Sequence, residues 1–222
     1  NGVSGALRFA TGTTSNGNSG SVSIATGDAT NGKAGAMCVT VGIGNTASGG
    51  RIAVVSGTTT DASSGGAIAV LSGYSTERSS GDIDLATADS GNNGVSGALR
   101  FATGTTSNGN SGSISLSTGT STLGKGGGVL LSVGAGNTAN GGDIALTAGQ
   151  TTSDGGAGGD LIFTAGVATR GVGGSVQVAG GASAASAGGA MTFEGGVGHA
   201  MTGGSIAVHS GRSASTTSGS ID

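Results

Sequence analysis

Hydrophobic and polar residues alternate in short stretches that recur about every fifteen residues along the chain. In each stretch a large apolar residue is followed two positions later by a second one, as in "GSVSIATG", "GSISLSTG" and "GDIALTAG". Alternation with a period of two is typical of a β-strand with one buried face. The pattern therefore predicts one short strand per repeat, and the frequent Gly residues and the lack of helical spacing disfavour helices.

The pair of a small residue and Gly that opens each stretch gives a frame of numbered columns. Column two is always Gly, and column nine is Gly in every full repeat except the one with Ala88. Columns four and six hold large apolar residues, whereas columns eight and eleven hold smaller ones. The Gly-rich remainder predicts at least two tight turns per repeat. Repeats start at residues 4, 19, 34, 49, 65, 80, 96, 111, 126, 141, 158, 173, 188, 203 and 218.

Constant columns allow each strand to stack in register on the strand of the next repeat, about 4.8 Å away. We therefore expect an all-β fold, a β-solenoid of about fifteen 15-residue coils that runs over 1–222 with a narrow, flattened cross-section and with its handedness left open. The absence of Pro fits this fold, because Pro would remove a donor from the ladder. The expected structural core of columns four and six comprises Leu7, Phe9, Val22, Ile24, Ile52, Val54, Ile68, Val70, Ile83, Leu85, Leu99, Phe101, Ile114, Leu116, Ile144, Leu146, Leu161, Phe163, Phe193 and Ile206.

Six of these short repeats form a longer repeat of 92 residues. The segment "NGVSGALRFATGTTSNGNSGS" occupies 1–21 and returns unchanged at 93–113. The chain thus divides into six-coil blocks at 1–92 and 93–184, with a partial third copy at 185–222. The duplication either lengthens a rod or defines a lateral contact that recurs once per block.

Composition and charge exclude several classes of function. The 222 residues include 52 Gly and no Trp, and the formal net charge is −3. Eight Lys and Arg residues are spread singly, so neither nucleic acid nor membrane insertion is expected. Cys38 stands alone, which excludes an internal disulfide and leaves either a spectator thiol or a crosslink between rods.

No constellation of catalytic, cofactor-binding or metal-binding residues emerges from the columns. His199 and His209 fall in different columns, and the acids, including Asp82 and Asp84, fill no column as repeated calcium sites would. The string "GKGGG" at 124–128 lacks the spacing of a phosphate-binding loop. We expect no catalytic residue, no metal, no cofactor and no enzymatic activity.

Outward columns carry apolar residues on particular coils. Side-to-side packing of rods would bury them, so they are candidate lateral contacts. Column ten is too varied for the flat Thr array of an ice-binding solenoid, although ice or glycan binding stays an alternative, with polysaccharide cleavage as a third. The candidate lateral contacts are Ile43, Val55, Leu71, Tyr74, Leu130, Ile162, Val167 and Val197.

The motif G-x-[ILV]-x-[LVF]-x-[ST]-G resembles Gly/Ser/Thr-rich repeat proteins of microalgae and related microbes, and more loosely bacterial solenoid adhesins. The resemblance implies a structural role outside the cell or at its surface. The repeat is already running at Asn1 and still running at Asp222, so we expect open ends that accept another coil. The expected function is a building block of an extracellular filament, hair, wall or adhesive layer, with self-association as the main interaction and glycans as further partners.

Overall fold

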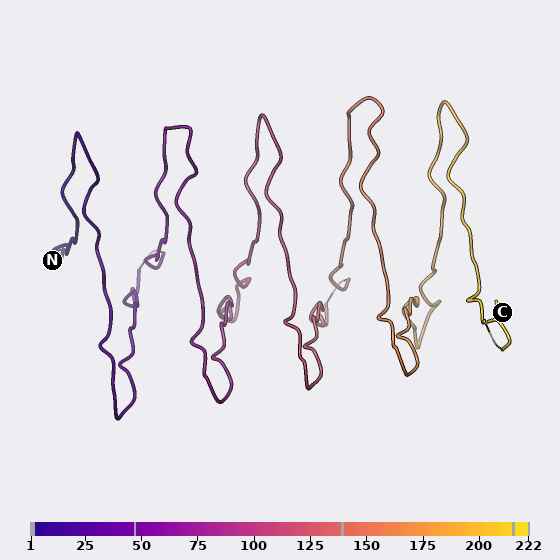
Figure 1. The fold of residues 1–222 in the computed structure, drawn as a ribbon, viewed down its shortest axis with the longest axis horizontal. Coiled ribbons are helices and arrows are strands. Elements are labelled where there is room, and N and C mark those ends of the chain that lie inside the picture. The colour runs from indigo at the N-terminus through magenta and orange to yellow at the C-terminus, as the bar shows by residue number, and fades with distance from the viewer. Residues whose placement is uncertain (1–2, 47, 139, 215, 222) are drawn as a thin grey trace. The chain divides into compact units, whose positions relative to one another are not determined.

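The computed structural model describes residues 3–46, 48–138, 140–214 and 216–221 (Figure 1). Within these ranges the backbone contains no helix and no strand. Straight segments alternate with bends, and the bends recur at the period of the sequence repeat. The bends lie at 15–17, 30–32, 45–46 with 48, 60–63, 76–78, 92–93, 107–109, 122–124, 137–138 with 140, 153–155, 169–171, 184–186, 199–201 and 214 with 216.

The chain forms two units, Asn1–Ile114 (unit 1) and Ser115–Asp222 (unit 2). In unit 1 the bends at 15–17 and 60–63 lie at the upper end of the trace in Figure 1, and the bend at 30–32 lies at the lower end. The bend at 45–46 recedes from the viewer. The chain therefore returns to the same side after three repeats, whereas the predicted solenoid completes a coil in one.

Unit 2 follows the same order. Its bends at 122–124 and 169–171 lie at the lower end of its trace, the bend at 153–155 lies at the upper end, and the bend at 137–138 recedes (Figure 1). A spacing of 92 residues therefore corresponds to two turns in each unit. Duplicated segments consequently share a side, as the identical bends at 15–17 and 107–109 do within unit 1.

No residue of the described chain is buried. The accessible surface is 22117 Å². A compact protein of this mass would expose about 8,800 Å² and its unfolded chain about 29,000 Å². Among the residues that the structure describes, successive turns therefore make no strand ladder, and the stacked solenoid stays a prediction.

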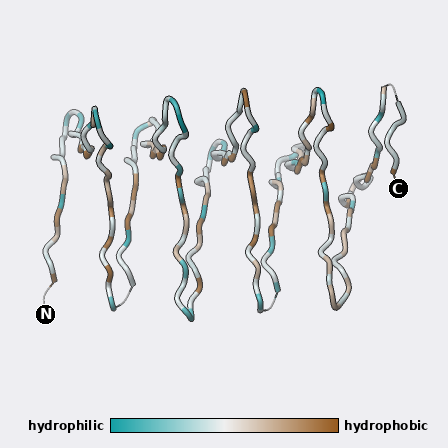
Figure 2. Tube along the Cα trace, turned by 90° about the horizontal axis from the view of Figure 1, so that it is seen from below, coloured by the Kyte–Doolittle hydropathy of each residue, from teal (hydrophilic) through white to brown (hydrophobic). Residues whose placement is uncertain are grey.

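Columns four and six nevertheless differ from their neighbours in exposure. In the segment Val129, Leu130 and Leu131 the exposed fractions are 67%, 88% and 68%, and in Leu161, Ile162 and Phe163 they are 54%, 76% and 65%. Column five is thus the most exposed in both segments, as the alternation of an extended backbone requires. The twenty residues expected in the core expose between 49% and 83% of their surface. Figure 2 shows these hydrophobic positions along the straight segments.

Candidate functional surface

A backbone hydrogen bond closes the bends of several repeats. The N–H of Gly66 in column two donates to the carbonyl oxygen of Gly57 in column nine of the preceding repeat, at 2.9 Å. We call this bond the glycine clasp. It recurs from Gly81 to Gly73, Gly159 to Gly149, Gly174 to Gly166, Gly189 to Gly181, Gly204 to Gly196 and Gly219 to Gly211, at 2.8–3.0 Å.

Column eight determines where the clasp forms. In the seven clasped bends, column eight is Ser, Ala or Gly: Ser56, Ser72, Ala148, Ala165, Gly180, Gly195 and Ser210. In the other seven, where the described residues form no clasp, column eight is β-branched: Thr11, Thr26, Val41, Thr87, Thr103, Thr118 and Val133. Two methyl-sized groups on Cβ fill the space between the incoming and outgoing chain.

The same approach crowds column two at several bends. A Cβ placed on Gly50 would lie 2.7 Å from Cγ1 of Val41, and one placed on Gly142 would lie 2.8 Å from Cγ1 of Val133. In the clasped bends the obstacle is backbone, since a Cβ on Gly66 would lie 3.2 Å from the nitrogen of Gly57. No side chain fits at these points without displacing the chain.

Column-eight hydroxyl groups form hydrogen bonds across one clasped bend and one bend without a clasp. The hydroxyl of Ser56 donates to the carbonyl oxygen of Gly66 at 2.7 Å, and the hydroxyl of Thr118 donates to that of Gly127 at 3.2 Å. Five of the six residues that are half-buried are in column eight of clasped bends: Ser56, Ala148, Ala165, Gly195 and Ser210. Column eight is therefore the most enclosed column of the repeat.

Hydroxyl groups of column eleven accept hydrogen bonds from backbone N–H groups within their own bends. The hydroxyl oxygen of Ser75 accepts the backbone N–H of Arg78 at 2.9 Å, and Ser183 accepts that of Ser186 in the same way at 2.9 Å. Such turns are a local use of Ser and Thr hydroxyls. Column eleven also contains Ala and Gly, so this hydrogen bond is confined to repeats in which the column supplies a hydroxyl.

The upper bends add a backbone requirement. Gly17 and Gly109 have φ of 123°, and Gly155 has φ of 74°. All three lie in upper bends of their units (Figure 1). Such angles favour Gly, which explains "SNG" and "SDG" at these bends.

The candidate lateral contacts are exposed but do not form one face. Their exposed fractions run from 76% to 104%. The column-ten members lie next to bends on different sides: Ile43 precedes the receding bend at 45–46, whereas Tyr74 precedes the lower bend at 76–78. The structure therefore spreads these residues around the turns and leaves a lateral contact as a prediction.

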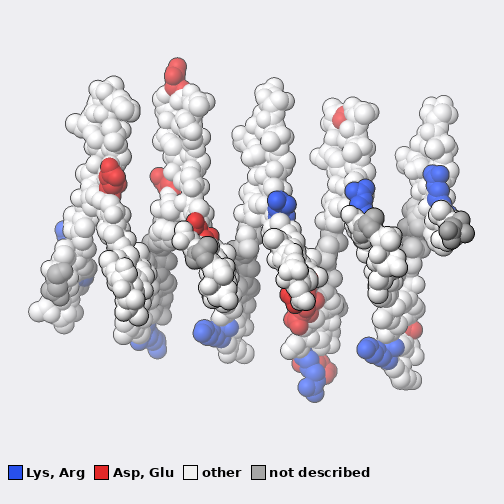
Figure 3. Space-filling view, turned by 180° about the vertical axis from the view of Figure 1, so that it is seen from behind, with Lys and Arg blue, Asp and Glu red and all other residues white. Residues whose placement is uncertain are grey.

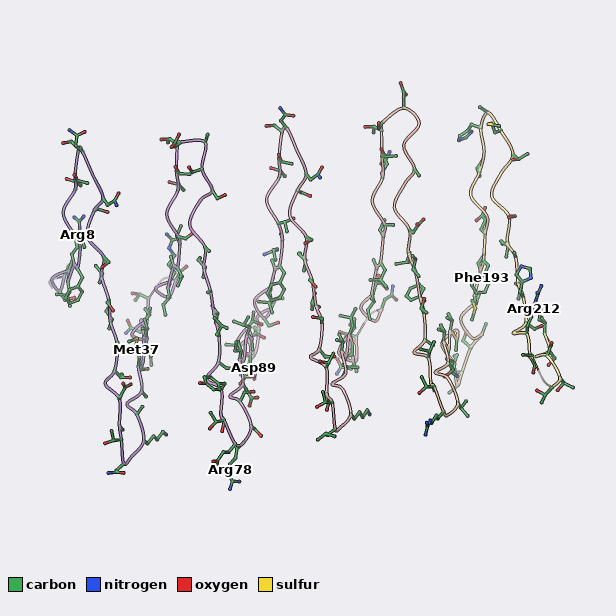
Figure 4. All side chains as sticks on the ribbon, in the orientation of Figure 1. Arg8, Met37, Arg78, Asp89, Phe193 and Arg212 are labelled. Atoms are coloured by element: carbon green, nitrogen blue, oxygen red, sulfur yellow. The ribbon has the colours of Figure 1, made fainter. Side chains whose placement is uncertain are left out.

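Single Lys or Arg residues lie in or beside lower bends of both units, although they form no run in the sequence. In unit 1, Lys33 follows the lower bend at 30–32, and Arg78 lies in the lower bend at 76–78, where Figure 4 shows it pointing away from the chain. In unit 2, Lys125 follows the bend at 122–124, and Arg170 lies in the next lower bend. Figure 3 shows Lys and Arg at the lower ends of turns in both units. The signal was a spacing of 45 residues within each unit, which is meaningful only once three repeats are known to make a turn.

Titratable side chains that could support chemistry stay apart. His199 lies in an upper bend and His209 in a straight segment, and the thiol of Cys38 is exposed. Across the described ranges, no three residues of His, Cys, Asp or Glu come close enough to hold a metal ion. The same part of the chain contains no helix that is long and apolar enough to span a membrane.

The comparisons with known proteins add no relative: no family model, no curated protein and no solved structure matches the chain.

Proposed function

We propose that the chain is a non-enzymatic structural protein that builds an extracellular filament, hair, wall or adhesive layer by association of its straight segments. One observation carries this proposal: the large side chains of columns four and six are exposed in every described repeat. Covering one such side chain contributes about 1.5–3 kcal/mol. Straight segments without a ladder also expose backbone donors and acceptors that bind another extended segment.

The identical columns specify what covers these segments. A straight segment of this chain meets its own pattern in any other repeat, so neighbouring turns and further copies present the same alternation of large and small residues. Pairing in register would place column four on column four and column six on column six, as the predicted solenoid requires. The proposed partner of a straight segment is therefore another segment of the chain itself, either in a neighbouring turn or in a second copy.

Fibre diffraction of concentrated protein tests this proposal. Paired segments should give a reflection near 4.7–4.8 Å, and electron microscopy of the same sample should show filaments. Infrared spectra should gain the amide band of β-sheet in proportion to the assembled fraction. Monodisperse monomers without β-sheet at all concentrations would refute the proposal.

A further inference from the structure

Charges of opposite sign occupy different parts of unit 2. Of the three Lys and Arg residues of this unit, Arg170 lies in a lower bend and Lys125 directly follows one, whereas Arg212 lies on a straight segment two residues before the bend at 214 (Figure 4). The four described acids lie elsewhere: Asp154 is in an upper bend, and Asp143, Asp160 and Glu194 are in straight segments. Among the described residues, the lower bends at 122–124 and 169–171 of unit 2 therefore each have a cation and no acid in or directly beside them.

The lower bends of unit 1 present cations together with acids. Lys33 is preceded by Asp28, and Arg78 is preceded by Glu77. Lys33 and Lys125 are 92 residues apart, as are Arg78 and Arg170. Thr120 and Thr169 stand 92 residues after Asp28 and Glu77, so unit 2 has Thr where unit 1 has the two acids. The duplicated blocks thus share the cations and differ in whether an acid stands near each cation in the sequence.

We propose that the lower bends of unit 2 bind an acidic polysaccharide. A linear polymer with regularly placed carboxylates or sulfates can contact single cations on successive turns. Hydroxyls beside or in the same bends, including those of Ser121, Thr122 and Thr217, are donors and acceptors for sugar hydroxyls. The three cations are exposed, so the surface is open to a polymer.

The surface suits a polysaccharide better than a nucleic acid. Single strands are held by closely spaced phosphate contacts and by aromatic side chains on which bases stack. The lower bends of unit 2 contain no aromatic residue over 120–126, 167–173 and 212–218, and they supply only three cations. This inference goes beyond self-association, because the bends lie outside the segments that would pair.

The test uses the full chain and two matched double variants. Binding to immobilised polygalacturonate, dextran sulfate and neutral dextran is measured at low ionic strength. K125Q/R170Q should weaken binding to the acidic polymers about fivefold to tenfold, since exposed ion pairs contribute a few-fold each. K33Q/R78Q, which makes the same substitutions 92 residues earlier, should change binding by less than about twofold.

Each outcome decides the proposal. Binding to either acidic polymer that falls with added salt and with K125Q/R170Q supports it, and the two polymers distinguish carboxylate from sulfate. Equal losses in both double variants, no binding by the unmodified chain, or tighter binding to a single-stranded DNA oligonucleotide would overturn it. Sedimentation of all three proteins reports self-association separately, so a failure of the proposed assembly is distinguished from a failure of polysaccharide binding.

Discussion

Unit 1 and unit 2 have the same repeat frame but differ in how many of their bends are closed by a glycine clasp. Five of the seven column-eight residues in unit 1 are Thr or Val, and two of its bends are clasped. In unit 2 five of the seven are Ser, Ala or Gly, and five bends are clasped. Branching at Cβ of the column-eight residue therefore decides whether the glycine clasp forms, while the other columns keep the same residue types.

The charge pattern separates the units in a second, independent way. Unit 1 places acids beside the cations of its lower bends, and unit 2 does not. The repeat frame thus fixes the place of each residue in its repeat. A few substitutions at exposed or crowded columns then give the two related units different surfaces.

The largest expected effect concerns the columns that the units share. Asp at two column-four positions, as in I52D/I68D of unit 1 or I144D/L161D of unit 2, should abolish assembly in both units alike. Placing an unpaired carboxylate within a paired apolar column costs more than about 3 kcal/mol per site. Sedimentation and the infrared β-sheet band measure the loss. The control A53D/A69D changes the adjacent column five and should retain assembly; equal loss there would show that columns four and six have no special role.

Column two should give the next largest effect. Gly50→Ala and Gly142→Ala would each place a Cβ less than 3.0 Å from a Val methyl group. Overpacking of this kind costs about 1–3 kcal/mol, to be read as a lower urea midpoint of the assembled protein. Gly49→Ala and Gly141→Ala are controls, because a Cβ there meets nothing within 4 Å. The double variant V41A/G50A should recover the midpoint, and failure to recover would place the cause elsewhere.

Exchanging column eight should interconvert the two kinds of bend. Ala165→Val should open the clasp between Gly174 and Gly166, and Val41→Ala should allow one between Gly50 and Gly42, because the branch is added in one case and removed in the other. A net change of about 1 kcal/mol is expected for one hydrogen bond. Hydrogen exchange of the Gly174 and Gly50 amides measures it, with protection falling in the first variant and rising in the second. Unchanged protection in both would mean that the branch does not control the bend.

The smallest effect concerns charge. D28T/E77T gives unit 1 the residues that unit 2 has at a spacing of 92, and should raise binding of the full chain to polygalacturonate by about twofold to threefold at low salt. The increase should vanish near physiological ionic strength. A gain that persists there would point to a contact other than charge.

Much of the local structure follows from sequence. The period of the bends, the straight segments around columns four and six, and the alternation that leaves Leu130 and Ile162 more exposed than their neighbours all follow from the columns. The crowding at Gly50 and Gly142 could not be derived, because it depends on the approach of column eight across the bend. The role of column eleven depends on hydroxyl geometry in the same way.

The arrangement of repeats around a turn was beyond the sequence. Nothing in a fifteen-residue pattern says that three repeats pass before the chain returns to the same side, so the relation between Lys125 and Arg170 was invisible. The stacking of aliphatic columns rests on pairing between segments, which one extended chain does not display. It stays a prediction for the diffraction experiment.

The glycine clasp has the same length in bends that contain different numbers of residues. The bond is 2.9 Å both from Gly81 to Gly73 and from Gly159 to Gly149, although two more residues lie within the second bend. Additional residues are therefore accommodated beyond the closure, where they displace no straight segment. A foreign peptide inserted after Asp154 should be displayed outward from its bend with the preceding and following repeats unaltered, which makes the clasped bends natural positions for grafting.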